Sequence, residues 1–304
     1  MQNTLAESIT LRGIGLHSGK TITLVLYPAS ENTGIVFVRS DVKSKDNTIP
    51  ARWDRVVDTQ LCTVIGNAEG VSVGTIEHLM SALRGLEIDN VRIVLDGPEV
   101  PVMDGSAMPF VTLIEEAGIV KQTAPRRLIR VLKKICVEQE GKKVTLAPAG
   151  SSIFGGEIAF SHPQIGRQVF EIELSGGVYK EMVADSRTFG FLQEVEWMRS
   201  KGLALGGSLD NAVVLNETTV INPEGLRHAD EFVRHKILDA IGDLYLAGVQ
   251  ILGAYHGFKG GHAMNNGLLH ALFSDESAYE IVELYDHLPI GASSLFMMQG
   301  VLNA

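Results

Sequence analysis

Two side chains on one predicted helix could hold a metal ion. His235 and Asp239 stand four positions apart in the segment His-Lys-Ile-Leu-Asp, and this spacing places them on one face of a helix, about one turn apart. An imidazole and a carboxylate at this separation can chelate a divalent ion, and zinc favours such ligands. The pattern HExxH is absent. Taken alone, the pair therefore fits the polar face of an ordinary amphipathic helix better than a metal site.

An internal repeat relates this helix to one in the first half of the chain. Residues 77–94 align without gaps on residues 235–252, and both segments predict a helix that leads through a short turn into an apolar strand. Residues 19–24 similarly match residues 141–146, where a Gly-Lys turn enters a strand. Two matches in the same order favour duplication over chance similarity.

The repeat predicts an α+β fold of two domains, each a two-layer sandwich of a sheet and helices, with the active site at the domain interface. We expect domains at residues 1–122 and 127–304, joined by a basic, proline-containing linker. The second half is longer, and the segment at about 186–222, rich in glycine and apolar residues, is the expected insertion. Neither GxGxxG nor GxxxxGK[ST] occurs, so a nucleotide cofactor lacks its usual sequence support.

Charge and cysteine content restrict the class of protein. The 304 residues carry a net charge of −10, with a pI of about 5.4, which argues against a nucleic-acid-binding surface. Cys62 and Cys136 show no CxxC spacing, as expected in a reducing compartment. The sequence shows neither a signal-peptide pattern nor an apolar run of roughly 18 residues that could span a membrane. We therefore expect a cytoplasmic protein without stable membrane insertion.

The duplication supplies a third metal ligand. His78 lies on the first-half helix that corresponds to the helix of His235, one position away in the alignment. If the halves pack about a pseudo-two-fold axis, these helices face each other, and both histidines converge with Asp239 on one zinc ion. Glu77 would then lie beside a metal-bound water, whose pKa falls to about 7, and could act as its general base.

A further carboxylate and a loop histidine extend this arrangement. Asp243 lies one more turn along the helix of Asp239 and could orient and charge a nearby histidine, although a solvated helix-end carboxylate is the simpler interpretation. The obvious candidate is His262, in the glycine-rich segment 258–266, although a single loop histidine is more often an ordinary surface residue. A histidine in a polar loop is a better catalytic candidate than one on an apolar face.

Several ordered motifs resemble one family over essentially the whole chain. They are Gly15-Leu-His-Ser-Gly19, Thr75-Ile-Glu-His-Leu79, Pro101-Val-Met-Asp-Gly-Ser-Ala107, Ser186-Arg-Thr-Phe-Gly-Phe191, Leu203-Ala-Leu-Gly-Gly-Ser208, Phe232-Val-Arg-His-Lys-Ile-Leu-Asp-Ala-Ile-Gly-Asp-Leu244 and Gly261-His-Ala-Met-Asn-Asn266. The sequence is similar to the UDP-3-O-acyl-N-acetylglucosamine deacetylases, zinc enzymes of lipid A biosynthesis in Gram-negative bacteria.

The resemblance implies a reaction and the residues that perform it. The family's zinc ligands fall on His78, His235 and Asp239, and one Zn²⁺ per chain is implied. The reaction is hydrolysis of the 2-acetamido group of a UDP-linked, 3-O-acylated glucosamine, which releases acetate. Glu77 is the implied general base, and His262, held by Asp243, is its cationic partner. The hydroxyl of Thr188 is implied to help stabilise the oxyanion. Either Glu77 or His262 could protonate the leaving amine.

The resemblance also implies substrate contacts. Lys236 and Lys259 match positions near the sugar and diphosphate, Phe160 would pack on the uridine, and Asp104 would support a metal ligand from behind. The implied substrate-binding set continues with residues at the cleft and along an acyl-chain passage in the insertion: Leu16, His17, Phe189, Leu192, Val195, Leu203, Ala204, Gly207, Ser208, Ala212 and Val214.

Two positions depart from the family pattern. Gly260 stands where the family usually has a serine, so the loop of His262 lacks that hydroxyl, and Gln60 stands where a methionine is usual. Two other functions remain open at this point: a small-molecule kinase with a duplicated α+β fold, and a non-catalytic, zinc-stabilised binding protein. No convincing phosphate-binding Gly-Ser loop supports the first. We expect a monomer, because the duplicated halves can bury each other's faces.

Overall fold

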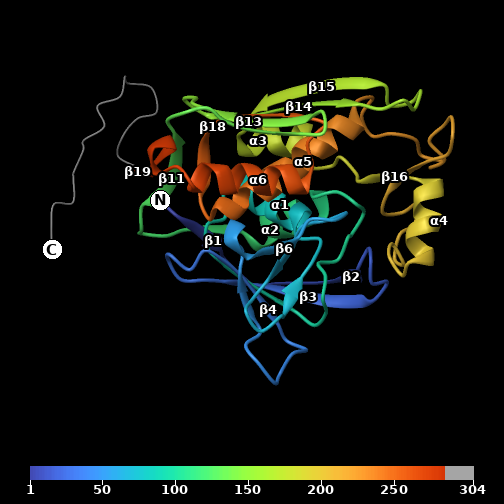
Figure 1. The fold of residues 1–304 in the computed structure, drawn as a ribbon. Coiled ribbons are helices and arrows are strands. Elements are labelled where there is room, and N and C mark those ends of the chain that lie inside the picture. The colour runs from blue at the N-terminus through green and yellow to red at the C-terminus, as the bar shows by residue number, and fades with distance from the viewer. Residues whose placement is uncertain (285–304) are drawn as a thin grey trace.

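The computed structural model describes residues 1–284. Two β-sheets form outer layers, and the main helices lie between them (Figure 1). The predicted α+β class is confirmed. The C-terminal end of the predicted second domain, residues 285–304, lies outside the described residues, and the predicted domain boundaries stay predictions. None of the helices within residues 1–284 is both long and apolar enough to cross a membrane.

The sheet of the first half alternates buried and exposed side chains along its strands. In its second strand, for example, Ile22, Leu24 and Leu26 are all buried on the face that meets the helices. The strand order is β2-β3-β9-β4-β5, with bounds β2 (Ile9–Ile14), β3 (Thr21–Pro28), β9 (Val91–Leu95), β4 (Ile35–Arg39) and β5 (Thr48–Pro50).

The sheet of the second half is built around one long strand, β18. Its main strands have the bounds β12 (Ile135–Gln139), β13 (Lys142–Ala147), β18 (Gln250–Phe258), β14 (Ser152–Ala159) and β15 (Arg167–Glu173). β13 and β14 both pair with β18, and β12 and β15 follow on the outside. The β11 (Arg126–Val131) and β19 (Tyr279–Leu284) strands continue the same sheet.

Strand pairing repeats between the halves in order and direction. β2–β3 and β3–β9 are antiparallel and β9–β4 is parallel, and β12–β13, β13–β18 and β18–β14 follow the same pattern. The short strands β1 (Asn3–Leu5) and β10 (Ile119–Lys121) pair antiparallel, as β11 and β19 do. Gly19 and Gly141, at the two predicted Gly-Lys turns, both have positive φ, 65° and 74°. The predicted repeat is therefore present in the fold.

Four helices follow the same repeat. Their bounds are α1 (Glu77–Gly85) and α2 (Met108–Ala117) in the first half, and α5 (Glu231–Leu244) and α6 (His262–Phe273) in the second. α1 and α5 pack so closely that a Cβ built at Gly242 would lie 2.0 Å from the carbonyl oxygen of Glu77. Only a glycine permits this approach. The contact brings the first turn of α1 against the last turn of α5.

In each half, further elements lie along the chain between the sheet strands that precede the central helix and that helix itself. The first half has β6 (Val56–Asp58), β7 (Val64–Gly66), β8 (Ser72–Val73) and the short 3₁₀ turn Trp53–Arg55. The second has α3 (Gly176–Met182), β16 (Phe189–Phe191), α4 (Leu192–Ser200) and β17 (Val213–Leu215). Two more 3₁₀ turns, Tyr245–Ala247 and Glu276–Ala278, follow α5 and α6. The expected insertion at 186–222 thus holds β16, α4 and β17, and Figure 1 shows β16 and α4 to one side of the two main sheets.

Candidate active site

His78, His235 and Asp239 meet where α1 crosses α5. Their ligand atoms all lie within 4.8 Å of one another, and the three side chains are buried. Oδ1 of Asp239 lies 3.3 Å from Nε2 of His235 and 3.6 Å from Nε2 of His78. The two imidazole rings stand nearly perpendicular, with centroids 5.0 Å apart. The convergence predicted from the repeat is therefore observed between residues 157 positions apart.

The donor set fits a divalent metal ion such as zinc. Oδ1 of Asp239 is buried without a hydrogen-bond donor, which is costly for a carboxylate unless a cation satisfies it. Zinc bonds of about 2.0–2.2 Å in a tetrahedron separate ligand atoms by about 3.3–3.6 Å, close to the two carboxylate–imidazole distances here. A metal coordinated by these residues would replace the missing donor.

His235 is held in the form that binds a metal. Its Nδ1 lies 3.0 Å from the carbonyl oxygen of Ser186, so Nδ1–H donates to that carbonyl and Nε2 presents a lone pair to Asp239. Burial lowers the pKa of His235 to about 3. The imidazole is therefore neutral at physiological pH, as a metal ligand must be.

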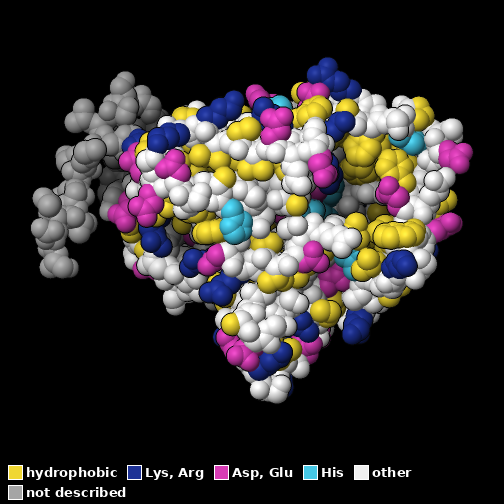
Figure 2. Space-filling view, viewed as in Figure 1, with side chains coloured by type: hydrophobic (Ala, Val, Ile, Leu, Met, Phe, Trp, Pro, Cys, Tyr) yellow, Lys and Arg dark blue, Asp and Glu magenta, His cyan; other side chains and the backbone are white. Residues whose placement is uncertain are grey.

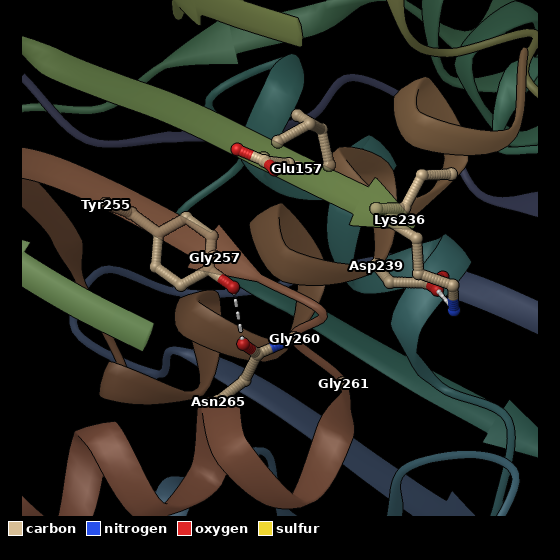
Figure 3. A pocket seen from close by; sticks show the side chains of 11 residues that line it. Glu157, Lys236, Asp239, Tyr255, Gly257, Gly260, Gly261 and Asn265 are labelled. Carbon is tan, nitrogen blue, oxygen red and sulfur yellow. Dashed lines mark hydrogen bonds and ion pairs between the residues drawn. The ribbon is translucent and has the colours of Figure 1, made fainter. Parts of the chain in front are cut away.

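Lys236 neutralises part of the negative charge at this centre. Its Nζ donates to Oδ2 of Asp239 at 2.8 Å (Figure 3). Burial opposes the charged form of Lys236, but the charge of Asp239 outweighs it and raises the pKa of the lysine. The pKa of Asp239 lies well below its usual range, because His235 and Lys236 overcome the effect of burial. The predicted substrate contact Lys236 is thus also a partner of a candidate metal ligand.

Glu77 and His262 face each other beside the metal ligands. Nε2 of His262 lies 3.8 Å from Oε1 of Glu77, and Nδ1 of His262 lies 2.8 Å from Oδ2 of Asp243. Burial alone would lower the pKa of His262, but the charges of Asp243 and Glu77 raise it to about 10. Burial raises the pKa of Glu77. The three residues named for proton chemistry from the sequence are therefore brought together.

The residues that hold this group in place were not among the predicted ones. Thr63 donates its hydroxyl to Asp243 at 2.6 Å and its backbone N–H to Oε2 of Glu77 at 3.1 Å. Asn265 donates to Asp243 at 2.9 Å and accepts from the hydroxyl of Tyr255 at 2.8 Å (Figure 3). Asn265 lies in the family motif 261–266, so a role in the site could have been predicted for it. The residues around Thr63 in the sequence give no such signal.

Phe189 begins β16, and Thr188 directly precedes that strand. The backbone N–H of Thr188 donates to Gly105 at 2.8 Å, and its carbonyl accepts from Val213 at 2.7 Å. The ring of Phe189 lies 6.3 Å from that of His235 and 5.9 Å from that of Phe160. Phe160 is 37% exposed. Phe189 therefore lies near the candidate ligand His235, Thr188 directly precedes Phe189 in the chain, and Phe160 lies on the outer side of Phe189.

A cleft of about 330 Å³ opens next to Cys62, the residue before Thr63. Its lining includes the predicted contacts His17 and Leu203, together with Gln60, Thr75 and Glu99. Both ring nitrogens of His17 are buried without a hydrogen-bond partner. The backbone of this segment is nevertheless fixed, since Glu99 accepts from the N–H of His17 at 2.8 Å.

The predicted passage residues lie on or beside the inserted elements. Hydrophobic side chains gather on the side of the molecule where Figure 1 draws β16 and α4 (Figure 2). Leu192 and Val195 are on α4, Ala212 and Val214 lie at β17 beside β16, and the loop between carries Leu203, Ala204, Gly207 and Ser208. Leu16 contacts this loop through its carbonyl, which accepts from Gly206 at 3.0 Å. Their role in holding an acyl chain stays a prediction.

Two predicted residues have other partners. Asp104 was expected behind a metal ligand, but its carboxylate accepts from Arg227 at 2.9 Å and from Ser106 at 2.8 Å, while the carbonyl of Ser186 holds His235. Lys259 follows β18, is exposed, and lies with Nζ 5.4 Å from the ring centroid of the neighbouring Phe258. The structure gives neither residue a direct contact with the candidate metal ligands.

Comparison with known proteins agrees with the candidate metal site found in the structure. Residues 2–274 match the LpxC family, described as UDP-3-O-acyl N-acetylglycosamine deacetylase. Proteins named UDP-3-O-acyl-N-acetylglucosamine deacetylase are 49% identical in Neisseria meningitidis (strain FAM18) and 46% identical in Pasteurella multocida, each covering 94% of both chains. The one from Myxococcus xanthus is 49% identical over 92% of this chain and 89% of its own. The resemblance inferred from the motifs is confirmed: the chain belongs to the LpxC family of UDP-3-O-acyl-N-acetylglucosamine deacetylases.

Proposed function

We propose that the protein hydrolyses the 2-N-acetyl group of UDP-3-O-acyl-N-acetylglucosamine in a zinc-dependent reaction, giving UDP-3-O-acyl-glucosamine and acetate for lipid A biosynthesis. The observation that carries the proposal is the position of Glu77. It directly precedes the candidate ligand His78 and lies 3.8 Å from His262. A base and a cationic acid therefore flank one side of a candidate metal site, as amide hydrolysis requires.

His78, His235 and Asp239 would hold the ion. When bound, zinc would lower the pKa of a water and polarise the acetyl carbonyl. The chain supplies the proton acceptor: Thr63 fixes Oε2 of Glu77 through its N–H, which leaves Oε1 on the side of His262. The raised pKa of Glu77 suits a group that must accept a proton and then give it up.

His262 supplies positive charge where the reaction develops negative charge. Asp243 holds its Nδ1–H, so Nε2–H points away from that carboxylate and toward the side of Glu77. A fixed imidazolium in a buried site stabilises an oxyanion without reorganisation. The proton for the departing amine has two sources within reach, Glu77 and His262. Thr188, which directly precedes β16, is the proposed hydroxyl donor to the same oxyanion.

The substrate would lie across the β16 side of the metal centre. Lys236 offers a charge that reaches both Asp239 and, at 5.7 Å, the ring of Phe189. Phe160 and Lys259 would contact the nucleotide part, and the insertion would receive the acyl chain. Each buried CH₂ of that chain is worth about 0.8 kcal/mol. Because α1 and α5 already bury each other, we propose that one chain acts as a monomer.

The direct test measures metal content and acetate release on the same protein. We expect about one zinc ion per chain and acetate release from UDP-3-O-acyl-N-acetylglucosamine. Glu77→Gln should keep the zinc and lose about 10²–10⁴-fold in turnover. Glu87→Gln, beyond the other end of α1, is the matched control and should keep activity. Full activity after zinc chelation would disprove the proposed mechanism, and zinc binding without acetate release would identify a non-catalytic, metal-stabilised protein.

A further inference from the structure

A stripe of buried carboxylates and imidazole runs along one face of α5. Glu231, His235, Asp239 and Asp243 follow one another at intervals of four residues, and none is more than 3% exposed. The last three hold the metal or orient His262 in the proposed function. Glu231, at the start of the helix, is fully buried at 0% exposure and has no part in that chemistry.

Four N–H groups surround the carboxylate of Glu231. Oε1 accepts from the backbone N–H of Arg187 at 3.0 Å and from its Nε at 2.9 Å. Oε2 accepts from Nη2 of Arg187 at 3.2 Å and from the backbone N–H of Arg227 at 2.7 Å. A buried carboxylate with this many donors is fully satisfied. Glu231 therefore accepts hydrogen bonds from both the side chain and the backbone of Arg187.

The guanidinium of Arg187 is also held from its other side. Nη1 donates to Glu224 at 2.5 Å and Nη2 donates to the carbonyl of Gly225 at 2.7 Å. The side chain of Arg187 is only 3% exposed. With partners on both sides, Arg187 cannot shift without breaking several charge-assisted hydrogen bonds in a buried environment.

The chain neighbours of Arg187 are Ser186, whose carbonyl contacts a candidate metal ligand, and Thr188, the proposed oxyanion donor. The carbonyl of Ser186 accepts the Nδ1–H of His235 at 3.0 Å and so sets which nitrogen of that ring faces Asp239. Thr188 follows, with its backbone held by Gly105 and Val213. A shift of Arg187 would thus displace the carbonyl that orients a metal ligand and the residue proposed to donate to the oxyanion.

We propose that Arg187 and Glu231 are positioning residues for a divalent metal ion and for Thr188. Through this pair, the first turn of α5 holds segment 186–188, and segment 186–188 in turn orients His235 one turn further along the same helix. The inference rests on the proposed function, because it takes His78, His235 and Asp239 as the metal ligands.

A purely structural ion pair makes a different prediction. Such a pair would change the stability of the fold and leave the zinc affinity of the folded protein unchanged. A positioning pair changes zinc affinity and turnover in protein that is fully folded, since partners behind a metal ligand typically contribute 10–100-fold to affinity or activity. Zinc affinity of the folded protein therefore separates the two roles.

The test uses two variants of the full chain. Glu231→Gln keeps the shape of the side chain and removes its charge, whereas Arg187→Lys keeps the charge and loses the fork of donors. For both, we expect zinc affinity, measured against a competing chelator, to fall about 10-fold or more, and kcat to fall more than KM changes. We also expect faster hydrogen exchange at Nδ1 of His235 in the zinc-loaded protein, observed by NMR. Arg187→Lys decides the question if Glu231→Gln does not fold.

A second partly buried ion pair provides the control. Asp89 accepts from Arg126 at 3.0 Å beyond the far end of α1. Asp89→Asn should destabilise the fold and leave zinc affinity and Nδ1–H exchange unchanged. Folded Glu231→Gln and Arg187→Lys with the zinc affinity and exchange of the wild type would overturn the inference alone. A wild-type protein that binds no zinc and releases no acetate would overturn the proposed function with it.

Discussion

Asp243 forms a hydrogen bond with His262 through one carboxylate oxygen and with Thr63 through the other. The distances are 2.8 Å from Oδ2 to Nδ1 of His262 and 2.6 Å from Oδ1 to the hydroxyl of Thr63. Thr63 also donates its N–H to Glu77. One residue of the β6–β7 loop therefore connects the two carboxylates on either side of the imidazole. This connection sets the separation of Glu77 and His262.

The charge of Asp243 should control the alkaline limb of the pH–rate profile. His262 acts in its protonated form in the proposed function, and Asp243 is a main cause of its raised pKa of about 10. Asp243→Asn removes that charge, so the pKa of His262 falls. His262 then loses its proton, and the enzyme its activity, at a lower pH than in the wild type. We expect the descending limb of kcat/KM to move toward neutral pH, with activity lowered by up to about 10²–10⁴-fold. An unmoved limb would assign it to another group.

The metal-free protein should be most stable near pH 6.5. The pKa of His262 is raised to about 10, so its contribution is complete below the ordinary value of about 6.5 and is lost as pH rises toward 10. The pKa of His235 is lowered to about 3, so folding is opposed as pH falls below about 6.5. Each effect should amount to a few kcal/mol.

Urea unfolding of the chelated protein across pH 4–10 measures both effects. His262→Gln should flatten the alkaline side of the curve, and His235→Gln should flatten the acid side. If both variants keep the pH dependence of the wild type, the charges of Asp243 and the burial of His235 do not have the assigned effect.

The sequence was sufficient for the parts of the fold that depend on local pattern. The helices at residues 77–86 and 235–244 and the strands that follow them are apolar and periodic, and the structure contains all of them. The duplication could also be recognised from the sequence, because the Gly-Lys turn and the central helix each depend on a short run of neighbouring residues that both halves retain. α5 begins one turn earlier than the aligned repeat, at Glu231, since the repeat extends only as far as the two sequences agree.

The features of the site that could not be predicted from the sequence depend on contacts between segments that are far apart in the chain. Thr63 and Asp243 are separated by 180 positions, and Arg187 and Glu231 by 44. A threonine or a glutamate at such a position has no distinguishing neighbours in the chain. The role expected for Asp104 was inferred from its motif alone, and its side chain pairs with Arg227. Spacing on one helix can be read from a sequence, whereas partners across the fold require the fold itself.

Removal of the metal should lower stability by an amount that depends on zinc concentration. An ion that binds only the folded state adds about 4 kcal/mol to the free energy of unfolding at 1,000 times its Kd. Asp239→Asn loses an anionic ligand whose Oδ1 has no other donor. We expect zinc to raise the melting temperature of the chelated wild type and to leave that of Asp239→Asn nearly unchanged. An equal zinc-dependent shift in both proteins would place the ion elsewhere.

The contact of α1 with α5 should tolerate no side chain at position 242. A Cβ there would lie 2.0 Å from the carbonyl oxygen of Glu77, so Gly242→Ala must push the two helices apart. Overpacking of this kind costs about 1–3 kcal/mol. Because Glu77 and His78 stand at the contact, we also expect lower turnover at saturating zinc. Urea unfolding and acetate release measure the two effects.

Gly267→Ala in α6 is the matched control for this substitution. Its Cβ would meet only a methyl group of Val137 at 3.7 Å, an ordinary contact. Alanine is favoured over glycine inside a helix by about 0.5–1 kcal/mol, so this variant should be slightly more stable than the wild type, with unchanged turnover. If Gly242→Ala were as stable and active as Gly267→Ala, α1 and α5 could not be as close as the structure shows. The position of Glu77 and His78 against α5 would then need another explanation, because that position follows directly from the approach of the two helices.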